Sequence, residues 1–142
     1  MSRPVIFTLG ACLLYFVQQT QCKTFGTCEL MMELKKQGFP ENHLNEWLCL
    51  IEAESSKQTE AIGGPDADGS FDYGLFQIND RYWCSTGDTP GKGCNVRCAD
   101  LLLDDIGKAS ECAKRINEQQ GFSAWVGWNN ECKGKNVPYP NC

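Results

Sequence analysis

Two carboxylic acid side chains of this 142-residue chain are placed so that acid and base chemistry could be divided between them. The first is Glu54, which follows Trp47 by seven residues and Ile51 by three, so that all three share one face of a predicted helix. A carboxyl group at the end of an apolar stripe is partly desolvated, which raises its pKa and lets it serve as a general acid near neutral pH. The competing interpretation is a solvated glutamate at a fraying helix end, since a perturbed carboxylate is only a statistical marker of a site.

The second carboxylic acid is Asp72, which stands between two aromatic residues, Phe71 and Tyr73, in a predicted strand. A strand holds its side chains at fixed angles on a rigid support. The neighbouring Asp68 precedes a glycine and is better explained as a turn former. One carboxyl group in an apolar setting and another on a nearby polar strand is the division of work that glycoside hydrolysis requires.

Amide and aromatic side chains that suit a sugar ligand occur near this pair and in a later segment. Aromatic faces can stack on the apolar faces of pyranose rings, and amides can bind hydroxyl and N-acetyl groups. The candidates are Gln77, Asn79, Tyr82, Trp83 and Trp125. Each aromatic residue could instead belong to the core, and for Trp128 the core is the preferred interpretation.

Other reaction centres are excluded by what the sequence lacks. It contains no glycine-rich nucleotide loop, no nucleophile elbow and no zinc-type histidine motif, and His43 is its single histidine. The aspartates of residues 66–72 do not form a calcium loop, because the glycine comes too early and Gln77 stands where the closing glutamate belongs. We therefore expect no metal and no cofactor.

The predicted elements place the two carboxyl groups in different parts of the fold. Apolar residues at helical spacing predict helices around residues 30–34, 44–55, 101–116 and 124–132. Turn signals separated by aromatic or branched residues predict a small antiparallel hairpin or meander at 61–79, and a loop rich in Gly and Cys follows at 84–98. This order predicts an α+β fold in which a mainly helical lobe and a small antiparallel β lobe enclose a cleft.

Composition and charge narrow the class of protein. With 42% apolar and 22% charged residues the chain has a globular composition, and its length favours a single domain. The formal net charge of −5 argues against nucleic acid and anionic membrane as partners, since both are bound through basic patches. We also expect the protein to be a monomer.

The N-terminus has the layout of a secretory signal peptide. A positive charge at Arg3 is followed by an apolar run at 5–17, a polar stretch and the small residue Cys22. The run is too short to span a bilayer comfortably, and a signal anchor is the alternative. We predict a signal peptide at residues 1–22 and a secreted, extracellular protein at residues 23–142, with a net charge of −6 once Arg3 is removed. Its eight cysteines suit a disulfide framework, but spacing alone leaves 105 connectivities open.

The motifs of the mature chain resemble those of C-type lysozymes, most closely the insect branch. The markers are Lys23-Thr-Phe-Gly-Thr-Cys-Glu-Leu, Trp47-Leu-Cys-Leu-Ile-Glu-Ala-Glu-Ser-Ser, Gly69-Ser-Phe-Asp-Tyr-Gly-Leu-Phe-Gln-Ile-Asn, Tyr82-Trp-Cys and Ala124-Trp-Val-Gly-Trp. The resemblance covers residues 23–142 and implies a lysozyme-like fold with four disulfides. The implied pairs are Cys28–Cys142, Cys49–Cys132, Cys84–Cys98 and Cys94–Cys112.

By this resemblance Glu54 matches the family's general acid and Asp72 its nucleophile or ion stabiliser, in a family that is itself the reference example for glycoside hydrolysis. The implied reaction is retaining hydrolysis of the β-1,4 bond between N-acetylmuramic acid and N-acetylglucosamine in bacterial peptidoglycan, and chitin oligosaccharides are a further expected ligand. Trp125 is expected to desolvate Glu54. The residues that match cleft positions are Ser70, Gln77, Asn79, Arg81, Tyr82, Trp83, Ala124 and Trp125.

Two features depart from the family pattern. Asp66 and Asp68 stand where many members have asparagine, and their charge is expected to raise the pKa of Asp72. Antibacterial members are commonly basic, whereas this chain is acidic, so we expect attraction to anionic cell walls only as the pH falls. We therefore expect an acid-shifted optimum, in an enzyme that is either digestive or antibacterial.

The alternative is a non-catalytic relative that binds carbohydrate or regulates another protein. Such relatives typically lose one or both carboxyl groups, and this chain has both. The calcium loop of the α-lactalbumin type needs aspartates where Lys108 and Ala109 stand, so calcium binding is not expected there. We therefore expect an enzyme.

Overall fold

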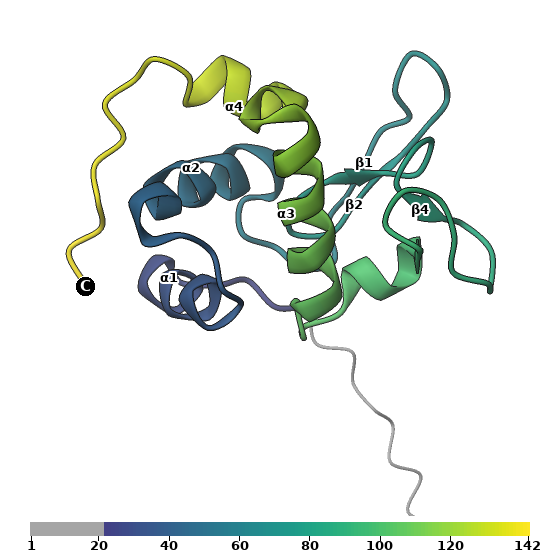
Figure 1. Cartoon of the computed structure of the whole chain (residues 1–142), viewed down its shortest axis with the longest axis horizontal. Helices are drawn as coiled ribbons and strands as arrows, with labels where there is room; N and C mark the ends of the chain where they lie inside the picture. The colour runs from purple at the N-terminus through teal and green to yellow at the C-terminus, as the bar shows by residue number, and fades with distance from the viewer. Residues whose placement is uncertain (1–21) are drawn as a thin grey trace, which may run out of the picture.

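The computed structural model describes residues 22–142, so the predicted signal peptide lies outside the described residues except for Cys22. Figure 1 shows helical segments and short strands on opposite sides of a central helix, α3, which confirms the predicted α+β fold. The helices are α1 (Thr27–Lys36), α2 (Leu44–Ser55), α3 (Gly107–Gln120) and α4 (Val126–Glu131). The strands are β1 (Ile62–Gly63), β2 (Asp72–Tyr73), β3 (Ile78–Asn79), β4 (Cys84–Ser85) and β5 (Val96–Arg97). Short 3-10 turns occupy Glu41–His43, Cys98–Leu102 and Phe122–Ala124.

Helix α2 carries Glu54 in its last turn and forms where its apolar periodicity predicts. Leu50 and Ile51 are fully buried and belong to the same core as the apolar face of α1. The helix ends because Ser56 adopts a left-handed conformation, with φ of 51°, and its N–H donates to the carbonyl of Glu52. Glu54 therefore lies at the edge of the helical lobe.

The β lobe is an antiparallel meander, as predicted for residues 61–79. Strand β2 lies between β1 and β3, and the register pairs Asp72 with Gly63 on one side and with Asn79 on the other. Asp72 therefore lies on the central strand, directly opposite Asn79. The short parallel pair β4–β5 falls in the stretch predicted as a loop.

The helix predicted at 101–116 is wrong for residues 101–106. Residues Cys98–Leu102 form a 3-10 turn, and α3 begins only at Gly107. Between them Leu103 is extended, with ψ of 152°, and the Asp105 carboxylate accepts a hydrogen bond from the Gly107 N–H at 2.9 Å. This bond satisfies a backbone N–H at the start of α3, so it favours a new helix over continuation of the turn.

Trp125 interrupts the helix expected at 124–132. Its backbone is extended, with φ of −101° and ψ of 123°, between a 3-10 turn and α4. The indole is 4% exposed, packs edge-on against Trp47 with ring centroids 5.5 Å apart, and donates its N–H to the carbonyl of Phe76 at 2.8 Å. Trp125 thus connects the segment before α4 with α2 and with the turn between β2 and β3.

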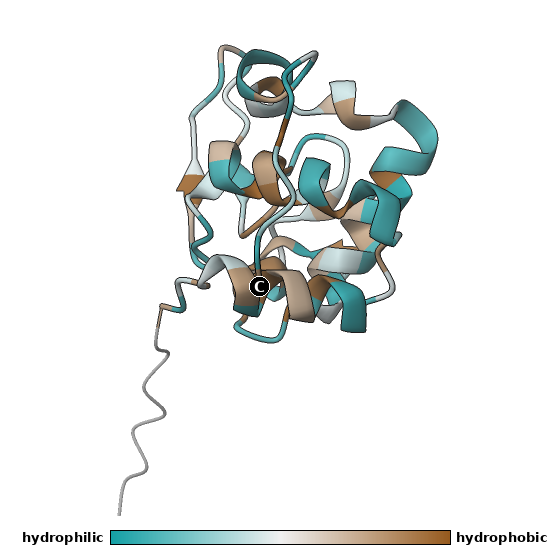
Figure 2. Ribbon diagram, turned by 90° about the vertical axis from the view of Figure 1, so that its left-hand side faces the viewer, coloured by the Kyte–Doolittle hydropathy of each residue, from teal (hydrophilic) through white to brown (hydrophobic). Residues whose placement is uncertain are grey.

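An aromatic core joins the two lobes. Trp47 of α2 is buried and packs edge to face with Phe39 and Phe76, with ring centroids 4.8 and 5.9 Å apart. Figure 2 shows the corresponding pattern along the helices, where brown hydrophobic segments alternate with teal hydrophilic ones. Because Phe76 belongs to the β lobe, its contact with Trp47 holds that lobe against α2.

Four disulfides link the eight cysteines of residues 23–142, in the pairs that the family resemblance implies. They are Cys28–Cys142, Cys49–Cys132, Cys84–Cys98 and Cys94–Cys112. The second joins α2 to the segment after α4, and the fourth joins the loop between β4 and β5 to α3. Both lobes are therefore cross-linked to the helices that border them.

Gly74 lets the turn between β2 and β3 approach the 3-10 turn that contains Leu101. Its φ is +76°, and a Cβ built on it would overlap the carbonyl oxygen of Leu101. The overlapped atom belongs to the backbone, so no side-chain rotation can relieve the overlap. The contact between these two turns therefore requires a glycine at this position.

We expect Gly74→Ala to lower the free energy of unfolding by at least about 3 kcal/mol, because it adds a backbone clash to the cost of a positive φ. Gly69→Ala is the matched control, since Gly69 has a φ of +83° but no atom within 4 Å of its built Cβ. This control should lose only about 1 kcal/mol. Denaturant unfolding followed by tryptophan fluorescence measures both, and equal losses would contradict the packing argument.

Candidate active site

A cleft of about 510 Å³ lies between the lobes and contains both candidate carboxyl groups. Helix α2 contributes Glu54, strand β2 contributes Asp72, and the segment before α4 contributes Trp125. The lining residues are Glu54, Asp66, Asp68, Ser70, Asp72, Gln77, Ile78, Asn79, Tyr82, Trp83, Ile116, Gln120, Ala124, Trp125 and Val126. The fold therefore brings the two carboxyl groups into one cavity from different lobes.

Glu54 lies in a partly buried position, as its apolar neighbours on α2 predict. Burial is the main cause that raises its pKa, and the negative charge of Asp72 raises the pKa further. In the opposite direction, the Gly127 N–H donates to Glu54 Oε1 at 2.7 Å and favours the ionised form. A Cβ at Gly127 would lie 2.7 Å from the same oxygen, so the missing side chain makes room for the carboxyl group.

Asp72 has polar neighbours, most of them acidic. Its Oδ1 accepts a hydrogen bond from the amide of Asn79 at 2.9 Å. Burial is the main cause that raises the pKa of Asp72, the Asn79 bond lowers it, and the charges of Asp66 and Asp80 raise it. The prediction that neighbouring negative charge raises the pKa of Asp72 is confirmed for Asp66. The second charge that acts is that of Asp80, whereas the sequence analysis named Asp68.

Asp68 is neutralised by Arg81 on the rim of the cleft. Asp68 Oδ1 accepts hydrogen bonds from the hydroxyl and the N–H of Ser70 at 2.5 and 2.9 Å, and Asp68 Oδ2 pairs with Arg81 Nη1 at 2.9 Å. These contacts, those of Ser70 first, lower the pKa of Asp68 to about 2. Arg81, expected to bind substrate, is not among the lining residues; its guanidinium pairs with Asp68, which is one of them.

The other seven residues expected to bind substrate all line the cleft. They are Ser70, Gln77, Asn79, Tyr82, Trp83, Ala124 and Trp125. Two of these side chains are already bound to the backbone: the Gln77 amide donates to two carbonyl oxygens at 3.0 and 2.9 Å, and the Trp125 indole donates to Phe76. Tyr82 is 61% exposed, and the Arg81 guanidinium carbon lies over its ring, 5.4 Å from the centroid.

Trp128 lies outside the cleft lining, in agreement with its interpretation as a core residue. Its ring stacks on Phe122 with centroids 5.5 Å apart, and its indole N–H donates to a Glu46 carboxylate oxygen at 2.6 Å. It packs against the core and is partly buried.

The cleft also contains residues that the sequence analysis did not assign to it. Ile78 and Ile116 are buried, and their apolar character indicates the core as readily as a site. Gln120 follows Ile116 by one helical turn on α3, and this i, i+4 spacing is the signal that could have identified it. Val126 is 71% exposed next to Trp125, and nothing in its sequence context distinguishes it.

Comparison with known proteins points to one family. The model of the C-type lysozyme/alpha-lactalbumin family matches residues 23–142. The chain is 49% identical to a lysozyme of Bombyx mori over 142 residues, the whole of both chains. It is 53% identical to a lysozyme of Antheraea mylitta over 120 residues, which is 84% of this chain and 100% of that one. The fold is similar to the crystal structure of canine milk lysozyme, with a TM-score of 0.74 and 41% identity over 81% of this chain and 93% of that chain.

The two causes that raise the pKa of Glu54 can be separated by a charge-removing variant. We expect Asp72→Asn to lower the pKa of Glu54 but to leave it above its ordinary value of 4.5, because burial is the larger cause. Carboxyl-carbon NMR titration measures this, and Asp88→Asn, which removes a charge outside the cleft lining, is the control. A Glu54 that titrates at 4.5 in Asp72→Asn would show that charge, and not burial, is responsible.

Proposed function

Since this chain belongs to the C-type lysozyme/alpha-lactalbumin family, we propose that Glu54 and Asp72 are its catalytic pair and that the cleft is its active site. The chain is a lysozyme, a glycosidase that cleaves the β-1,4 bonds between N-acetylmuramic acid and N-acetylglucosamine in peptidoglycan. The assignment of the pair rests on one observation: two carboxyl groups with different surroundings line one cleft. The lysozyme relatives do not favour the non-catalytic alternative.

Glu54 is the proposed general acid. Because burial raises its pKa, a protonated fraction persists towards neutral pH. Glu54 transfers this proton to the glycosidic oxygen while the bond between that oxygen and the anomeric carbon breaks. The Gly127 N–H, 2.7 Å from Glu54 Oε1, stabilises the carboxylate that the transfer leaves behind.

Asp72 is the proposed nucleophile or ion stabiliser. Its ionised carboxylate, held by the Asn79 amide at 2.9 Å, meets the positive charge that develops at the anomeric carbon. A water molecule then attacks that carbon, and the Glu54 carboxylate accepts the water proton. As nucleophile, Asp72 bonds to the anomeric carbon while the glycosidic bond breaks, and water then breaks that new bond; as ion stabiliser, Asp72 shields the same face of the cation. In both cases water enters from the side that the leaving group vacated, so the configuration is retained and both carboxyl groups regain their starting protonation.

The rest of the cleft suits a chain of N-acetylated sugars. Tyr82 and Trp83 supply aromatic faces from the β lobe, and Gln120 supplies an amide from α3 on the opposite side. We propose that peptidoglycan binds along this surface. Chitin oligosaccharides, which share N-acetylglucosamine and the β-1,4 linkage, are the second substrate class that it fits.

We further propose that residues 1–22 are a signal peptide and that residues 23–142 act as a secreted monomer. The family match begins at residue 23, where cleavage is predicted. Four disulfides are typical of an oxidising, extracellular compartment. Among residues 22–142, no helix is long and apolar enough to cross a membrane.

Replacing either member of the pair tests the mechanism. We expect Glu54→Gln to lower the rate of wall lysis at least about 100-fold, since an amide cannot donate the required proton. Asp72→Asn should lower it at least about tenfold through lost charge stabilisation. The control is Glu52→Gln, a change of the same chemistry on the exposed side of α2, whose surface ion pair with Lys57 contributes little. Equal rates for wild type and Glu54→Gln, at equal melting temperature, would remove Glu54 from the mechanism.

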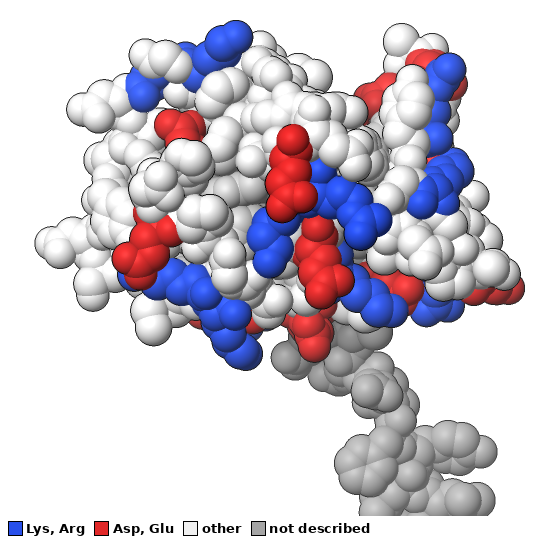
Figure 3. All heavy atoms as spheres, in the orientation of Figure 1, with Lys and Arg blue, Asp and Glu red and all other residues white. Residues whose placement is uncertain are grey.

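Two effects of pH oppose each other in this protein. The proposed mechanism requires a protonated Glu54 and an ionised Asp72. Because the pKa values of both groups are raised, the pH range that meets this requirement lies higher. The net charge of −6 for residues 23–142 repels anionic walls at neutral pH, and this repulsion weakens as carboxylates are protonated. Figure 3 shows acidic and basic side chains intermixed over α3, with no broad basic patch on that face to hold a wall. An acid-shifted optimum therefore has to come from substrate attraction and not from the catalytic pair.

The two effects separate on substrates of different charge. At low salt we expect faster lysis of anionic walls at pH 5 than at pH 7.5, because repulsion falls with pH. On a soluble, uncharged oligomer of N-acetylglucosamine, the optimum should lie at a higher pH, because only the catalytic pair titrates. Added salt should move the wall optimum towards that of the oligomer. Faster wall lysis at pH 7.5 than at pH 5 in matched low salt would refute the acid shift.

A further inference from the structure

The indole of Trp83, which lines the cleft, packs against a glycine of the loop between β4 and β5. A Cβ built on Gly93 would lie 2.6 Å from Trp83 Cε3 and 2.9 Å from Trp83 Cζ3. The next nearest atom is the backbone oxygen of Tyr82, at 3.1 Å. A side chain at position 93 would therefore displace either the Trp83 ring or the loop itself.

Two backbone hydrogen bonds hold this part of the loop beside the segment that carries the indole. The Gly93 N–H donates to the carbonyl of Tyr82 at 3.0 Å. The next N–H, that of Cys94, donates to the carbonyl of Trp83, also at 3.0 Å. Gly93 is thus fixed next to Trp83 by bonds that depend on neither side chain.

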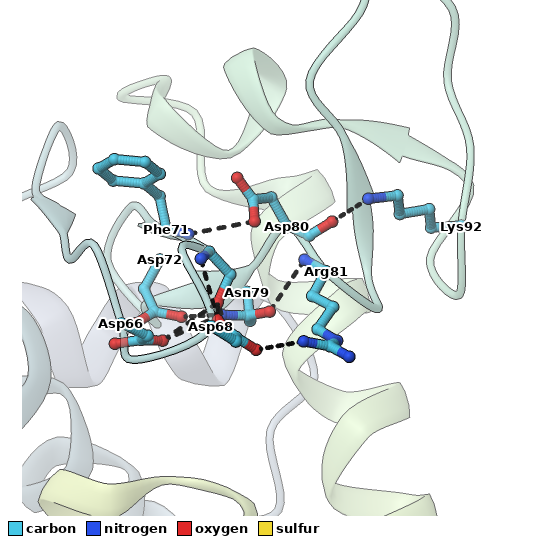
Figure 4. A network of polar contacts seen from close by, with 9 residues as sticks. Asp66, Asp68, Phe71, Asp72, Asn79, Asp80, Arg81 and Lys92 are labelled. Atoms are coloured by element: carbon cyan, nitrogen blue, oxygen red, sulfur yellow. Dashed lines mark hydrogen bonds and ion pairs between the residues drawn. The ribbon is translucent and has the colours of Figure 1, made fainter.

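The loop is also bound to the end of the β meander. Lys92, which directly precedes Gly93, donates from Nζ to the carbonyl oxygen of Asp80, the residue that follows β3 (Figure 4). Together with the two backbone bonds, this contact holds the loop against the β lobe from three points.

Helix α3 holds the same loop from the helical side. Arg115 Nη1 donates to the carbonyl oxygen of Gly93 at 2.9 Å. Cys112, three residues earlier and on the same face of α3, forms the disulfide with Cys94. Two adjacent loop residues are therefore attached to one helix, the first by a charge-assisted hydrogen bond and the second by a covalent bond.

These contacts relate two walls of the cleft to each other. Trp83 lines the cleft from the β lobe, and Ile116 and Gln120 line it from α3. Arg115 directly precedes Ile116, so neighbouring residues of α3 contact the loop and the cleft. The position of the Trp83 ring relative to α3 therefore depends on where Arg115 holds Gly93.

The edge of the indole that lies against Gly93 determines where its polar edge lies. In the fused rings, Nε1–H is on the side opposite Cε3 and Cζ3, so this packing turns the donor of Trp83 away from the loop. Trp83 is partly buried and packs against the core, which restricts rotation of the ring. A fixed aromatic face with one fixed donor suits a sugar that stacks and accepts a hydrogen bond.

We propose that Gly93 and Arg115 are positioning residues for sugar binding: Gly93 leaves room for the Trp83 ring, and Arg115 holds Gly93 in place from α3. The proposal rests on the proposed role of the cleft as the active site. Neither residue is among those that line the cleft, so both act through Trp83. Their substitution should weaken binding and raise KM, with little change in kcat, because the contact that is lost holds substrate and transition state alike.

Binding of an uncharged N-acetylglucosamine oligomer to the Glu54→Gln variant, which should not hydrolyse it, tests the role of Gly93. In this background we expect Gly93→Ala to raise Kd about three- to tenfold, since the displaced ring loses about one stacking contact or hydrogen bond. Gly91→Ala is the matched control, because it adds the same methyl group to the same loop at an ordinary 3.5 Å from its nearest neighbour, Ser85. Its Kd should change less than about twofold. Equal Kd values for the two variants would overturn the proposal.

Two substitutions of the exposed Arg115 test the contact from α3 without adding a clash. Arg115→Met keeps the length of the side chain but removes the donor, and we expect it to raise Kd about two- to fourfold. Arg115→Lys keeps a cation that can donate to the Gly93 carbonyl, so it should recover most of the lost affinity. With the Glu54 side chain intact, Arg115→Met should raise KM and change kcat by less than about twofold. A lower kcat at unchanged KM would contradict a role in binding.

The NMR signal of the Trp83 indole N–H reports the position of the ring directly. Gly93→Ala should shift this signal and leave that of Trp125, which is bound to the Phe76 carbonyl, unchanged. A weaker Kd without a shift of the Trp83 signal would show that the effect does not pass through Trp83, and this would overturn the proposal. Failure of the wild type to bind or hydrolyse the oligomer would instead refute the proposed function, and the shift of the Trp83 signal would still be measured.

Discussion

The placement of Trp125 is the constraint on which the whole site depends. Its indole N–H binds the carbonyl of Phe76 at 2.8 Å, and its ring packs edge-on against Trp47 at 5.5 Å. These contacts fix the segment before α4, the turn after Asp72 and the helix that carries Glu54 relative to one another. Because packed aromatic cores resist deformation, the separation of the two carboxyl groups is set by this cluster and not by the loops that connect the lobes.

The two carboxyl groups behave differently because different kinds of structure hold them. Burial is the main cause of a raised pKa in both. Glu54, however, meets one backbone donor from Gly127, whereas Asp72 meets a side-chain amide that is shared with other acceptors. A group with one dedicated donor can gain and lose charge during a reaction with little rearrangement. A group with a shared donor responds to every neighbour that competes for it.

Spacing along the chain predicted the features that local interactions determine. The position of Glu54 followed from the apolar stripe of α2, and that of Asp72 from turn signals within a few residues of β2. The break at Leu103 had a local signal, because the Asp105 carboxylate accepts from the Gly107 N–H only two residues later. The apolar spacing continues through residues 101–116 and concealed this signal. The diversion of Arg81 to Asp68 depends on which of several nearby carboxylates lies within reach, and this is a property of the folded β lobe.

Asp66 connects the surface charge of the protein with the chemistry of its cleft. Its carboxylate contributes to the negative charge that weakens attraction to anionic walls at neutral pH, and it also competes for the amide that holds Asp72. The first effect weakens binding to walls as the pH rises. The charge of Asp66 also raises the pKa of Asp72, so less of Asp72 is ionised as the pH falls. The fold does not require an aspartate at position 66. Asp66 is exposed and takes part in no ion pair among residues 22–142. Its side chain accepts hydrogen bonds only at 3.3 Å, from Ser70 and Asn79. With Asp72 in its proposed role, an acidic residue at this position therefore narrows the pH range for catalysis on walls, at little cost to stability.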